Sequence, residues 1–435
     1  MGTKQKLVKV ARNVLPTKAI RLLEEGYRSG RGKLTAARYG NPAHDLKILA
    51  VTGTNGKTTT ANYLNAILKT AGYKTAMFTT ALIEVGGRSR VNDLNATIPT
   101  TAQLQEFFKS AKAAGADYVI LEATSHALVQ HKLDGLKIEL AMMTNLTQDH
   151  LDYHGTMENY AAAKGKLFER LPRYIVLNRD DKWYDFFCQF QAGEHTLTYG
   201  VDKESDAQIK AVRLTSAGSD VKILVDHQTT LDLHTALPGK YNVYNLACAA
   251  GGAYALGVDL GHIQQGIASL HNVPGRFERV PSDKPFETIV DYAHTPDALE
   301  QLLETTRHIT KNRVILVFGA TGDRDKGKRP IMGEIAAKYA DRIYVTDEES
   351  YNEDPAAIRK AVMEGIHLGH GDSKTTEIAD RKEAIAKAIS IAKTGDTILI
   401  TGMGHEKFRI INGEKLPWND TEVAHDLLMA APKKK

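Results

Sequence analysis

The segment ILAVTGTNGKTTTANYL, residues 48–64, combines residue types that bind phosphate. An apolar run leads into a turn that contains Gly53 and Gly56, and an amphipathic pattern follows from about Lys57. A strand, a turn and a helix in this order point several backbone N–H groups and the positive end of the helix dipole at one place. Lys57 would reach the β- and γ-phosphates of a nucleotide, and Thr58 would hold magnesium. Although the usual consensus has a glycine where this chain has a valine, the context predicts a nucleotide site rather than a simple tight turn.

Two further residues have side chains that bind metal ions. Glu122, in VILEATSH, directly follows an apolar run, and His150, in TNLTQDHLDYHG, follows the next such run. The carboxyl ends of parallel strands form the edge of an α/β sheet where ligands collect. Each residue alone would be an ordinary edge residue, but their repetition beside a phosphate loop favours a metal site.

The elements that position these residues are predicted by apolar runs that alternate with segments of helical spacing. In the first half of the chain the runs lie at 47–52, 117–121, 139–145 and 174–178. This alternation is typical of a mostly parallel sheet with helices on both faces, so we predict an α/β fold. The polar stretch at about 200–235 predicts short strands that extend the sheet in antiparallel fashion.

A second alternating series follows NVPGRFERV, residues 272–280. Its apolar runs are ETIVDY, RVILVFG, RIYVTD and DTILITG, with helical segments between them. The series predicts a separate Rossmann-like α/β domain. We therefore divide the chain into a short basic helical segment (1–45), a central ATPase-type domain that carries the phosphate loop (46–274) and a C-terminal domain (275–435).

Composition limits the class of protein. The 435 residues are 42% hydrophobic, which is ordinary for a globular chain with two or three domains. No apolar stretch approaches the roughly 20 residues of a membrane span, and the N-terminus lacks the features of a signal peptide, so we expect a cytoplasmic protein. Cys188 and Cys248 are far apart in the sequence and form no Cys-x-x-Cys or Cys/His cluster, so neither a disulfide framework nor a thiolate zinc site is supported, and we expect each thiol to be buried or partly buried.

Positive charge is concentrated near the N-terminus. The chain has a net charge of +4, but residues 1–44 carry ten basic and two acidic side chains and so hold +8. Their apolar positions suit one or two amphipathic helices. Such helices would either dock on the rest of the protein or rest on an anionic membrane surface, and docking is the favoured interpretation. We do not expect nucleic acid as a partner.

Eight spaced motifs resemble those of the Mur ligases, and most closely the MurE branch, which adds the third amino acid to UDP-N-acetylmuramoyl-dipeptide. The motifs are VTGTNGKTTT, LEATSHALVQH, TNLTQDHLDYHGTMENYAAAKGKL, GKYNVYNLACAA, GRFERV, VDYAHTPDAL, FGATGDRDKGKRP and GMGHEKF. They occur in collinear order from about residue 47 to about residue 425. The phosphate loop alone would not be specific, whereas eight motifs in order are.

The resemblance implies an ATP-dependent ligase of peptidoglycan precursor synthesis. A substrate carboxylate would attack the γ-phosphate of ATP to give an acyl phosphate, and an amino group would then displace phosphate to form an amide. Lys57 and two magnesium ions would screen the negative charges. By the family pattern, Thr58 and Glu122 hold one ion and His150 holds the other. Lys164, which by itself would be taken for a solvated helix residue, matches the lysine that this family carbamylates to N6-carboxylysine, a further magnesium ligand.

The resemblance also assigns residues to the two larger substrates. Those matched to ATP are Gly53, Thr54, Asn55, Gly56, Lys57, Thr58, Thr59, Asn245, Arg276 and Asp291, with Asn245 toward the adenine. Those matched to the muramoyl-peptide are Thr97, Thr124, Gln130 and Lys132. Ile98 and Lys132 stand where threonine and arginine are usual, so recognition of the donor is expected to be altered. A site built from two domains also implies closure about a hinge near residue 275.

The acceptor positions depart further from the family. Arg324, Gly402 and Glu406 match residues that hold the incoming amino acid in the diaminopimelate-adding enzymes. Those enzymes have Asp-Asn-Pro-Arg after the VTD strand, whereas this chain has EESY at residues 348–351. An arginine that would pair with a distal carboxylate is missing and two acidic groups have arrived, which disfavours a diaminopimelate-type acceptor. Tyr351 would equally be explained by packing of the loop. The identity of the amino acid that is added therefore stays open.

The N-terminal part differs from the family as well. The family normally places a uridine-nucleotide-binding domain of roughly a hundred residues before the phosphate loop, and only about fifty residues precede it here. We expect that the basic segment binds the nucleotide-sugar end or that this end is bound in another way. A monomer is expected.

Two alternatives remain beside the MurE-type ligase. The first is the same chemistry on a different carboxylate, such as a polyglutamate-like or other peptide acceptor. The second is a regulatory protein that binds ATP or nucleic acid. The set of Glu122, His150 and Lys164 argues against the second alternative, because a pure binder does not need two metal ions.

Overall fold

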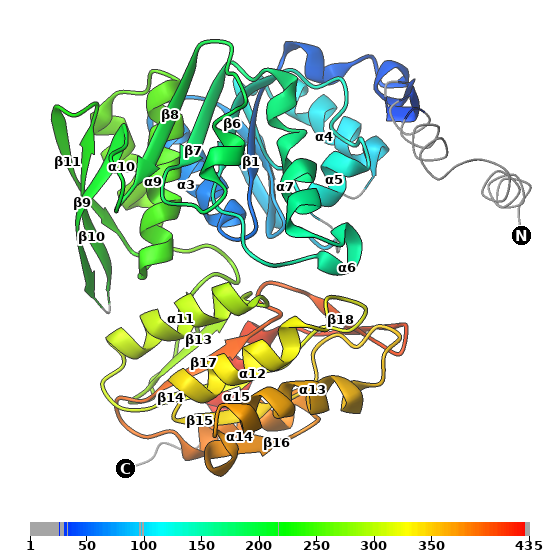
Figure 1. The fold of residues 1–435 in the computed structure, drawn as a ribbon, viewed down its shortest axis with the longest axis vertical. Coiled ribbons are helices and arrows are strands. Elements are labelled where there is room, and N and C mark those ends of the chain that lie inside the picture. Colours follow the sequence, from blue (N-terminus) through cyan, green and yellow to red (C-terminus); the bar gives the residue numbers. More distant parts are fainter. Residues whose placement is uncertain are drawn as a thin grey trace, which may run out of the picture.

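The computed structural model describes residue 26 and residues 30–32, 34–94, 97, 100–215 and 217–430. These residues form two parts that lie one above the other in Figure 1. The part coloured blue to green is built on an 11-stranded sheet, and the part coloured yellow-green to red is built on a 6-stranded sheet. The cavity described below lies where the two parts meet.

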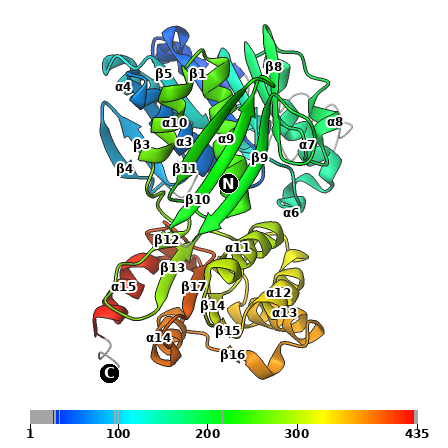
Figure 2. The ribbon, with the colours of Figure 1, turned by 90° about the vertical axis from the view of Figure 1, so that its left-hand side faces the viewer.

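The larger sheet has the strand order β11-β10-β9-β8-β7-β6-β1-β5-β2-β3-β4. Its strands are β1 (Lys47–Thr52), β2 (Thr75–Phe78), β3 (Leu82–Val85), β4 (Arg88–Val91), β5 (Tyr118–Glu122), β6 (Ile138–Met143), β7 (Tyr174–Asn178), β8 (His195–Gly200), β9 (Ala207–Thr215), β10 (Gly218–Val225) and β11 (Thr229–Thr235). The seven strands from β9 to β2 in this order run parallel, and antiparallel pairs close both edges. The predicted parallel sheet and its antiparallel extension are confirmed, and Figure 2 shows β9 to β11 reaching toward the second part.

Helices cover both faces of this sheet because its central strands are apolar on both sides. Leu49 and Val51 of β1 pack into one core, whereas Ile48 and Ala50 pack into the other, since successive side chains of a strand point to opposite faces. The first core is closed by α3 (Lys57–Thr70), α9 (Lys240–Ala255) and α10 (Leu260–Ser269). The second is closed by α4 (Thr101–Ala113), α5 (Ser125–Val129), α7 (Met157–Gly165) and the residues around α8 (Tyr184–Phe187), and α6 (Leu151–His154) precedes α7.

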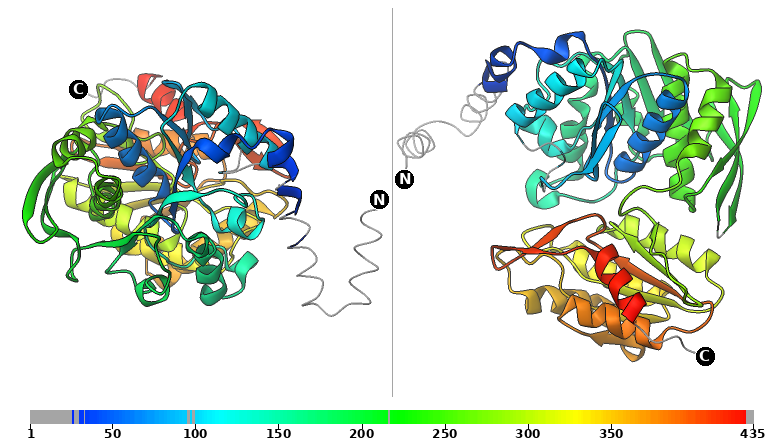
Figure 3. Two further views of the ribbon diagram at one scale, coloured as in Figure 1. Left: turned by 90° about the horizontal axis from the view of Figure 1, so that it is seen from above. Right: turned by 180° about the vertical axis from the view of Figure 1, so that it is seen from behind.

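The smaller sheet has the order β12-β13-β17-β14-β15-β16 and is parallel except for β12. Its strands are β12 (Glu278–Arg279), β13 (Glu287–Asp291), β14 (Val314–Phe318), β15 (Arg342–Val345), β16 (Thr375–Glu377) and β17 (Thr397–Thr401). One face is covered by α11 (Pro296–Ile309), α12 (Lys328–Tyr339) and α13 (Pro355–Leu368). The other is covered by α14 (Arg381–Ile391) and α15 (Asp420–Ala430), the latter red in the rear view of Figure 3.

Several short elements were not predicted from the sequence. These are β2 to β4, β16 and a separate hairpin of β18 (Phe408–Ile411) and β19 (Glu414–Pro417). They have three or four residues each, which is too short for a clear apolar pattern, and β4 and β19 are also largely exposed, whereas β2 is buried. Between the two parts, α10 ends at Ser269 and β12 begins at Glu278. We keep a domain boundary near residue 275 as a proposal.

The structure tests the predictions made from composition only in part. Most of the basic N-terminal segment lies outside the described residues. Cys248 is buried in α9, but Cys188 is exposed, so burial was wrong for this thiol, which follows the end of the short surface helix α8. Within the part of the chain that the structure describes, no helix is both long enough and apolar enough to cross a bilayer.

Two glycines allow α12 and α13 to pack closely. A Cβ on Gly333 would lie 2.2 Å from the carbonyl oxygen of Val362, and a Cβ on Gly365 would lie 1.8 Å from that of Pro330. Both clashes are with backbone, which cannot rotate away as a side chain can. The spacing of these two helices therefore depends on glycine at both positions.

We expect Gly365→Ala to destabilise the second part. The added methyl forces α12 and α13 apart, at about 1–3 kcal/mol, which corresponds to a fall in thermal midpoint of roughly 3–10 °C. The control is Gly251→Ala in α9, where a Cβ meets only Val176 Cγ1 at 3.5 Å. Alanine there should be neutral or stabilising because it favours the helix. Equal midpoints for the two variants in calorimetry would contradict this packing argument.

Candidate active site

A cavity of about 1170 Å³ lies between the two parts. Every residue that the sequence analysis assigned to catalysis, ATP or substrates lines it except Gly53 and Lys164. The lining residues in this set are Thr54, Asn55, Gly56, Lys57, Thr58, Thr59, Thr97, Glu122, Thr124, Gln130, Lys132, His150, Asn245, Arg276, Asp291, Arg324, Gly402 and Glu406. Residues that are far apart in the sequence thus meet at one cavity.

The phosphate loop joins the end of β1 to the start of α3. Gly53 and Gly56 have φ angles of 143° and 86°, which favour glycine. A Cβ on Gly53 would lie 1.8 Å from Thr144 Oγ1, and one on Gly56 would lie 2.1 Å from Asn245 Oδ1. Both glycines are therefore required by conformation and by space. Asn245 faces the loop itself.

Lys57 lies across the loop at the first residue of α3. Its Nζ donates to the carbonyl oxygens of Gly53, at 2.9 Å, and Thr54, at 2.7 Å. Burial lowers the pKa of this amine, and the nearby carboxylates of Glu122 and Asp149 oppose that shift. A cation held here faces the space in front of the N-terminus of α3, where anions are favoured.

Glu122 is buried at the end of β5, next to β1 in the sheet. Its carboxylate accepts hydrogen bonds from the backbone N–H of Thr80, at 2.9 Å, and from Thr80 Oγ1, at 2.8 Å. Thr80 Oγ1 also lies 2.7 Å from Thr97 Oγ1. The carboxylate is thus oriented by the loop after β2, a contact that sequence reasoning missed. Ile98 lies outside the described residues.

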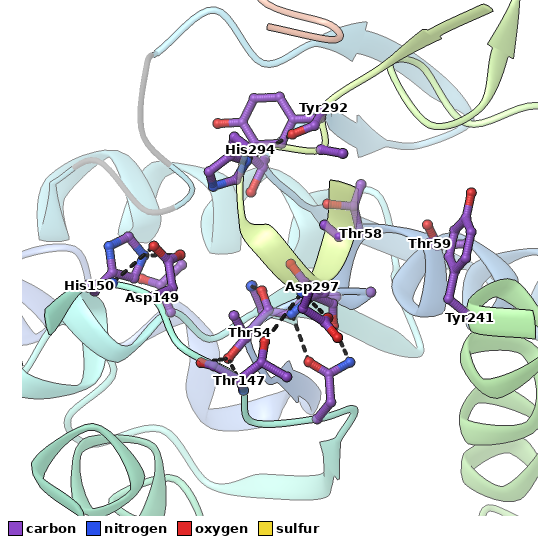
Figure 4. Close-up of a pocket in the computed structure, with 18 of the residues that line it drawn as sticks. Thr54, Thr58, Thr59, Thr147, Asp149, His150, Tyr241, Tyr292, His294 and Asp297 are labelled. Atoms are coloured by element: carbon purple, nitrogen blue, oxygen red, sulfur yellow. Dashed lines mark hydrogen bonds and ion pairs between the residues drawn. The ribbon is translucent and has the colours of Figure 1, made fainter. Parts of the chain in front are cut away.

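His150 precedes α6 with a φ of 54°, and its ring lies beside the carboxylate of Asp149 in Figure 4, 3.3 Å away. Burial lowers the pKa of His150 to about 3, against the opposing charge of Asp149. The imidazole is therefore neutral near pH 7, which is the form that binds metal ions. Burial raises the pKa of Asp149, but the charges of His150 and Lys328 outweigh burial and hold that pKa well below its usual range.

Lys164 lies beneath the loop and not at its surface. Its side chain is buried, donates to the carbonyl oxygen of Gly53 at 2.7 Å and stands over the ring of Tyr160 at 4.5 Å. The interpretation of Lys164 as a solvated helix residue is therefore wrong, because α7 turns this face toward the phosphate loop. Burial, and then the charge of Lys57, hold the pKa of Lys164 well below its usual range.

Two residues from the second part reach the loop or lie near it. Arg276 Nη2 donates to Thr58 Oγ1 at 3.1 Å, and its guanidinium stacks on Tyr292 at 4.6 Å. The carboxylate of Asp291 accepts from the backbone N–H groups of Phe277, at 2.7 Å, and Ala293, at 2.8 Å, and burial raises its pKa. Arg276 can therefore approach a nucleotide directly, whereas Asp291 holds the backbone around it.

The muramoyl-peptide positions lie on the first part. Thr124 caps α5 by accepting from the backbone N–H of Ala127 at 3.2 Å, and Gln130 follows the end of that helix. Lys132 lies two residues further, and burial lowers its pKa. These residues, Thr97 and Glu122 all line the cavity.

On the second part of the chain, Gly402 lines the cavity just after β17 and has a φ of 106°. A Cβ on Gly402 would lie 1.9 Å from Glu348 Oε1. The Glu348 carboxylate is buried and accepts from the backbone N–H of Gly319 at 3.1 Å. Burial raises its pKa. Glu348 is thus part of the framework of this end of the cavity.

Contacts between the two parts were missed from the sequence. Asn55 Nδ2 donates to Asp297 Oδ2 at 2.8 Å, and Asp297 lies beside the loop in Figure 4. Lys328 Nζ lies 3.8 Å from Asp149 Oδ1, and His405 lies 3.0 Å from the carbonyl oxygen of Thr80. All of these residues except Thr80 lie within the spaced motifs, and that is the only signal that could have found them.

The described residues supply only part of a magnesium site, because magnesium at nucleotide sites also takes phosphate oxygens and waters as ligands. Among the described residues, no group of three or more histidine, cysteine, aspartate or glutamate side chains is arranged around a common point. Thr58 and Glu122 provide a hydroxyl and one carboxylate, and His150 provides a neutral imidazole. A carbamate on Lys164 would add the missing charge from beneath the loop.

Two family descriptions match the chain. The Mur ligase middle domain matches residues 51–253, and the Mur ligase glutamate ligase domain matches residues 275–404. Both matches fall within the two parts described above.

Individual relatives cover most of the chain. UDP-N-acetylmuramoyl-L-alanyl-D-glutamate--2,6-diaminopimelate ligase of Syntrophomonas wolfei is 40% identical over 94% of this chain and 84% of its own length. The ligase of the same name from Geobacillus kaustophilus is 41% identical over 90% of this chain and 80% of its own length.

Solved structures extend the comparison. A structure with the same ligase name has a TM-score of 0.63 at 33% identity and covers 94% of this chain and 83% of its own. Mycobacterium tuberculosis folylpolyglutamate synthase, at 18% identity and a TM-score of 0.69 over 86% of this chain and 92% of its own, shares the fold. The chain therefore belongs to the Mur ligase family.

Proposed function

We propose that this protein is an ATP-dependent ligase that joins an amino acid to the carboxylate of a UDP-N-acetylmuramoyl-peptide, as a MurE enzyme does in peptidoglycan precursor synthesis. One observation carries the proposal. The phosphate loop, Glu122 with His150, and Arg324 with Glu406 line a single cavity between the two parts of the chain. The relatives named as ligases of this type support the choice of donor.

The chemistry needs two anions to approach each other. The terminal carboxylate of the peptide attacks the γ-phosphate of ATP, the bond to ADP breaks, and an acyl phosphate forms. The neutral amine of the acceptor then attacks the acyl carbon, phosphate leaves, and an amide results. The backbone N–H groups at the start of α3 and the Lys57 ammonium supply positive potential where the anions meet.

The family is ATP- and magnesium-dependent in general. Magnesium, when bound, screens the phosphate charges and activates the γ-phosphate. Thr58 and Glu122 would hold one ion and His150 the other. The bonds from Thr80 fix the direction of the Glu122 carboxylate, so the ligand is oriented before an ion arrives.

Lys164 is suited to carbamylation. The carbamate forms when a neutral amine attacks carbon dioxide and loses a proton, and burial favours the neutral amine of Lys164. Its product is an anion on a long arm, directed at the loop that Lys57 also contacts. This carbamate would be the second anionic ligand that the metal site needs.

The second part of the chain completes the site. Arg276 would contact the phosphates of ATP and Asn245 would lie toward the adenine, while Asp291 holds the backbone around Arg276. Thr97, Thr124, Gln130 and Lys132 would contact the muramoyl-peptide from the first part. Binding of ATP between the two parts would then favour their closure.

The function is tested by measuring phosphate release from ATP with a UDP-muramoyl-dipeptide and a panel of amino acids. Release that requires both the dipeptide and an amino acid, with the expected mass of the tripeptide product, supports the proposal. Release with a polyglutamate-type carboxylate and none with the muramoyl-dipeptide would overturn it in favour of a different donor.

We expect Lys57→Ala to lower kcat by about two to three orders of magnitude, because it removes the positive charge that faces the phosphates. The matched control is Lys109→Ala, which truncates an exposed lysine of α4 outside the cavity lining. The control should keep the parent rate. Near-normal turnover of the Lys57 variant would remove the phosphate loop from the mechanism.

We expect Lys164→Ala to be nearly inactive and to recover partly with a short-chain carboxylate at high concentration, which would occupy the place of the carbamate. A second readout does not depend on activity. After exchange with ¹³C-bicarbonate, the parent protein should show a carbamate resonance that the variant lacks. Full activity of the variant in bicarbonate-free buffer would exclude Lys164 from the site.

A further inference from the structure

Thr58, Glu122 and His150, the residues proposed above to hold magnesium, lie on the first part of the chain, and each is supported from the second part. For Thr58 the support is direct, because Arg276 Nη2 donates to Thr58 Oγ1 at 3.1 Å. A hydroxyl oxygen has two lone pairs, so this bond leaves one of them for an ion. Glu122 and His150 are each reached through one intermediate residue.

The support of Glu122 passes through Thr80. His405, on the loop after β17, donates from Nε2 to the carbonyl oxygen of Thr80 at 3.0 Å. The backbone N–H and the hydroxyl of Thr80 donate in turn to the two oxygens of the Glu122 carboxylate. The position of His405 therefore influences the direction of this carboxylate.

His405 is itself held firmly in the second part. It is 4% exposed, and its ring centroid lies 5.1 Å from that of Tyr292. A Cβ on Gly275 would lie 2.3 Å from the backbone nitrogen of His405, so the two loops are in close contact. The other ring nitrogen, Nδ1, is buried and has no hydrogen-bond partner among the described residues, as in a neutral ring with its proton on Nε2. His405 is thus a fixed donor to Thr80.

The support of His150 passes through Asp149. Asp149 Oδ1 accepts from the backbone N–H of His150 at 2.9 Å, and Asp149 Oδ2 lies 3.3 Å from the ring Nε2 of His150 (Figure 4). Lys328 Nζ, at the start of α12, lies 3.8 Å from Asp149 Oδ1. The Asp149 carboxylate therefore contacts the second part of the chain and both the backbone and the ring of the proposed ligand.

Lys328 is a buried cation on a rigid helix. Arg329, the next residue, donates to Glu353 from Nη1 at 3.0 Å and from Nη2 at 2.9 Å, which fixes the start of α12. The side chain of Lys328 is 3% exposed and that of Asp149 is 7% exposed. A buried charge that loses its partner is costly, so the pair of Lys328 and Asp149 favours the docked arrangement of the two parts.

We propose that Lys328 and His405 are positioning residues that complete the metal site when the two parts of the chain meet. The proposal rests on the metal site of the function proposed above. Lys328 orients His150, and His405 orients Glu122, each through its intermediate residue. Tight binding of the ion therefore requires the docked arrangement. ATP is then activated only after the second part has closed over it, when the site excludes water.

The test measures the affinity for Mn²⁺, which prefers oxygen ligands as magnesium does and gives an electron paramagnetic resonance signal when free. The whole chain is titrated with Mn²⁺ and a non-hydrolysable ATP analogue, with the protein in excess so that free analogue does not compete. His405→Leu and Lys328→Met should each raise the Kd of Mn²⁺ by about tenfold, as residues that orient metal ligands do. An unchanged Kd in both variants would overturn the proposal.

Conservative and remote variants complete this experiment. His405→Gln keeps an N–H donor close to the place of Nε2, so it should recover most of the affinity that His405→Leu loses. The matched controls are His425→Leu on α15 and Lys326→Met before α12. Both remove exposed side chains outside the cavity lining and should keep the parent Kd. A Kd for His405→Gln as high as that for His405→Leu would contradict the path through Thr80.

Calorimetry separates positioning from stability. Lys328→Met leaves the Asp149 carboxylate buried without its partner and should lower the thermal midpoint. The double variant Lys328→Met/Asp149→Asn removes that unpaired charge, so it should regain the midpoint but not the affinity for Mn²⁺. Recovery of both would show that the pair only stabilises the fold and would overturn the role of Lys328.

Hydroxylamine separates this inference from the ligase function, because with ATP and UDP-muramoyl-dipeptide it traps the acyl phosphate as a hydroxamate. Absence of hydroxamate from the parent protein would overturn the ligase function, whereas the Mn²⁺ titration uses no donor and still decides the role of the two residues. When the parent forms hydroxamate, His405→Leu and Lys328→Met should need about tenfold more magnesium for half-maximal rate. An unchanged requirement in both would contradict the proposal.

Discussion

The absence of side chains at Gly53 and Gly56 is the constraint on which the rest of the site depends. A Cβ at either position would overlap Thr144 on the neighbouring strand-end or Asn245 on α9. Thr144 and Asn245 pack directly against the loop, so its backbone has little room to move and its carbonyl oxygens accept hydrogen bonds at fixed positions. The carbonyl oxygen of Gly53 accepts hydrogen bonds from both Lys57 and Lys164. The two amines and the start of α3 thereby form one rigid cluster.

That cluster also explains how the two parts of the chain are joined. Arg276 meets Thr58, and Asp297 meets Asn55, so the second part contacts the phosphate loop itself rather than a remote surface. Lys328 adds a charge beside Asp149. These contacts are polar and involve few side chains, as in interfaces that open and close. The second part of the chain therefore touches the residues that we propose to bind the nucleotide.

The sequence predicted the framework well, for physical reasons that also explain its failures. Buried parallel strands such as β1 and β5 are continuous apolar runs, and Glu122 and the phosphate loop follow such runs directly, so their place at one sheet edge could be inferred. The β18–β19 hairpin has no apolar run and was missed. The burial of Lys164 was also missed, because the four-residue helix α6 and the turn after it set the orientation of α7, and short turns leave little pattern in the sequence. Contacts between parts, such as His405 with Thr80, depend on tertiary geometry alone.

The acceptor end is built so that it can vary without disturbing the chemistry. The loop after β15 is fixed by backbone bonds at Gly322 and Tyr351, to which the Glu349 side chain adds a bond from the N–H of Ile410. Glu348, by contrast, is held against Gly402 and Gly319 and contributes to the frame. The backbone bonds of this loop do not depend on the charge of the side chains that it carries. Such a division lets one fold activate a single kind of carboxylate and transfer it to different amines, with selectivity set by a few charges on a rigid loop.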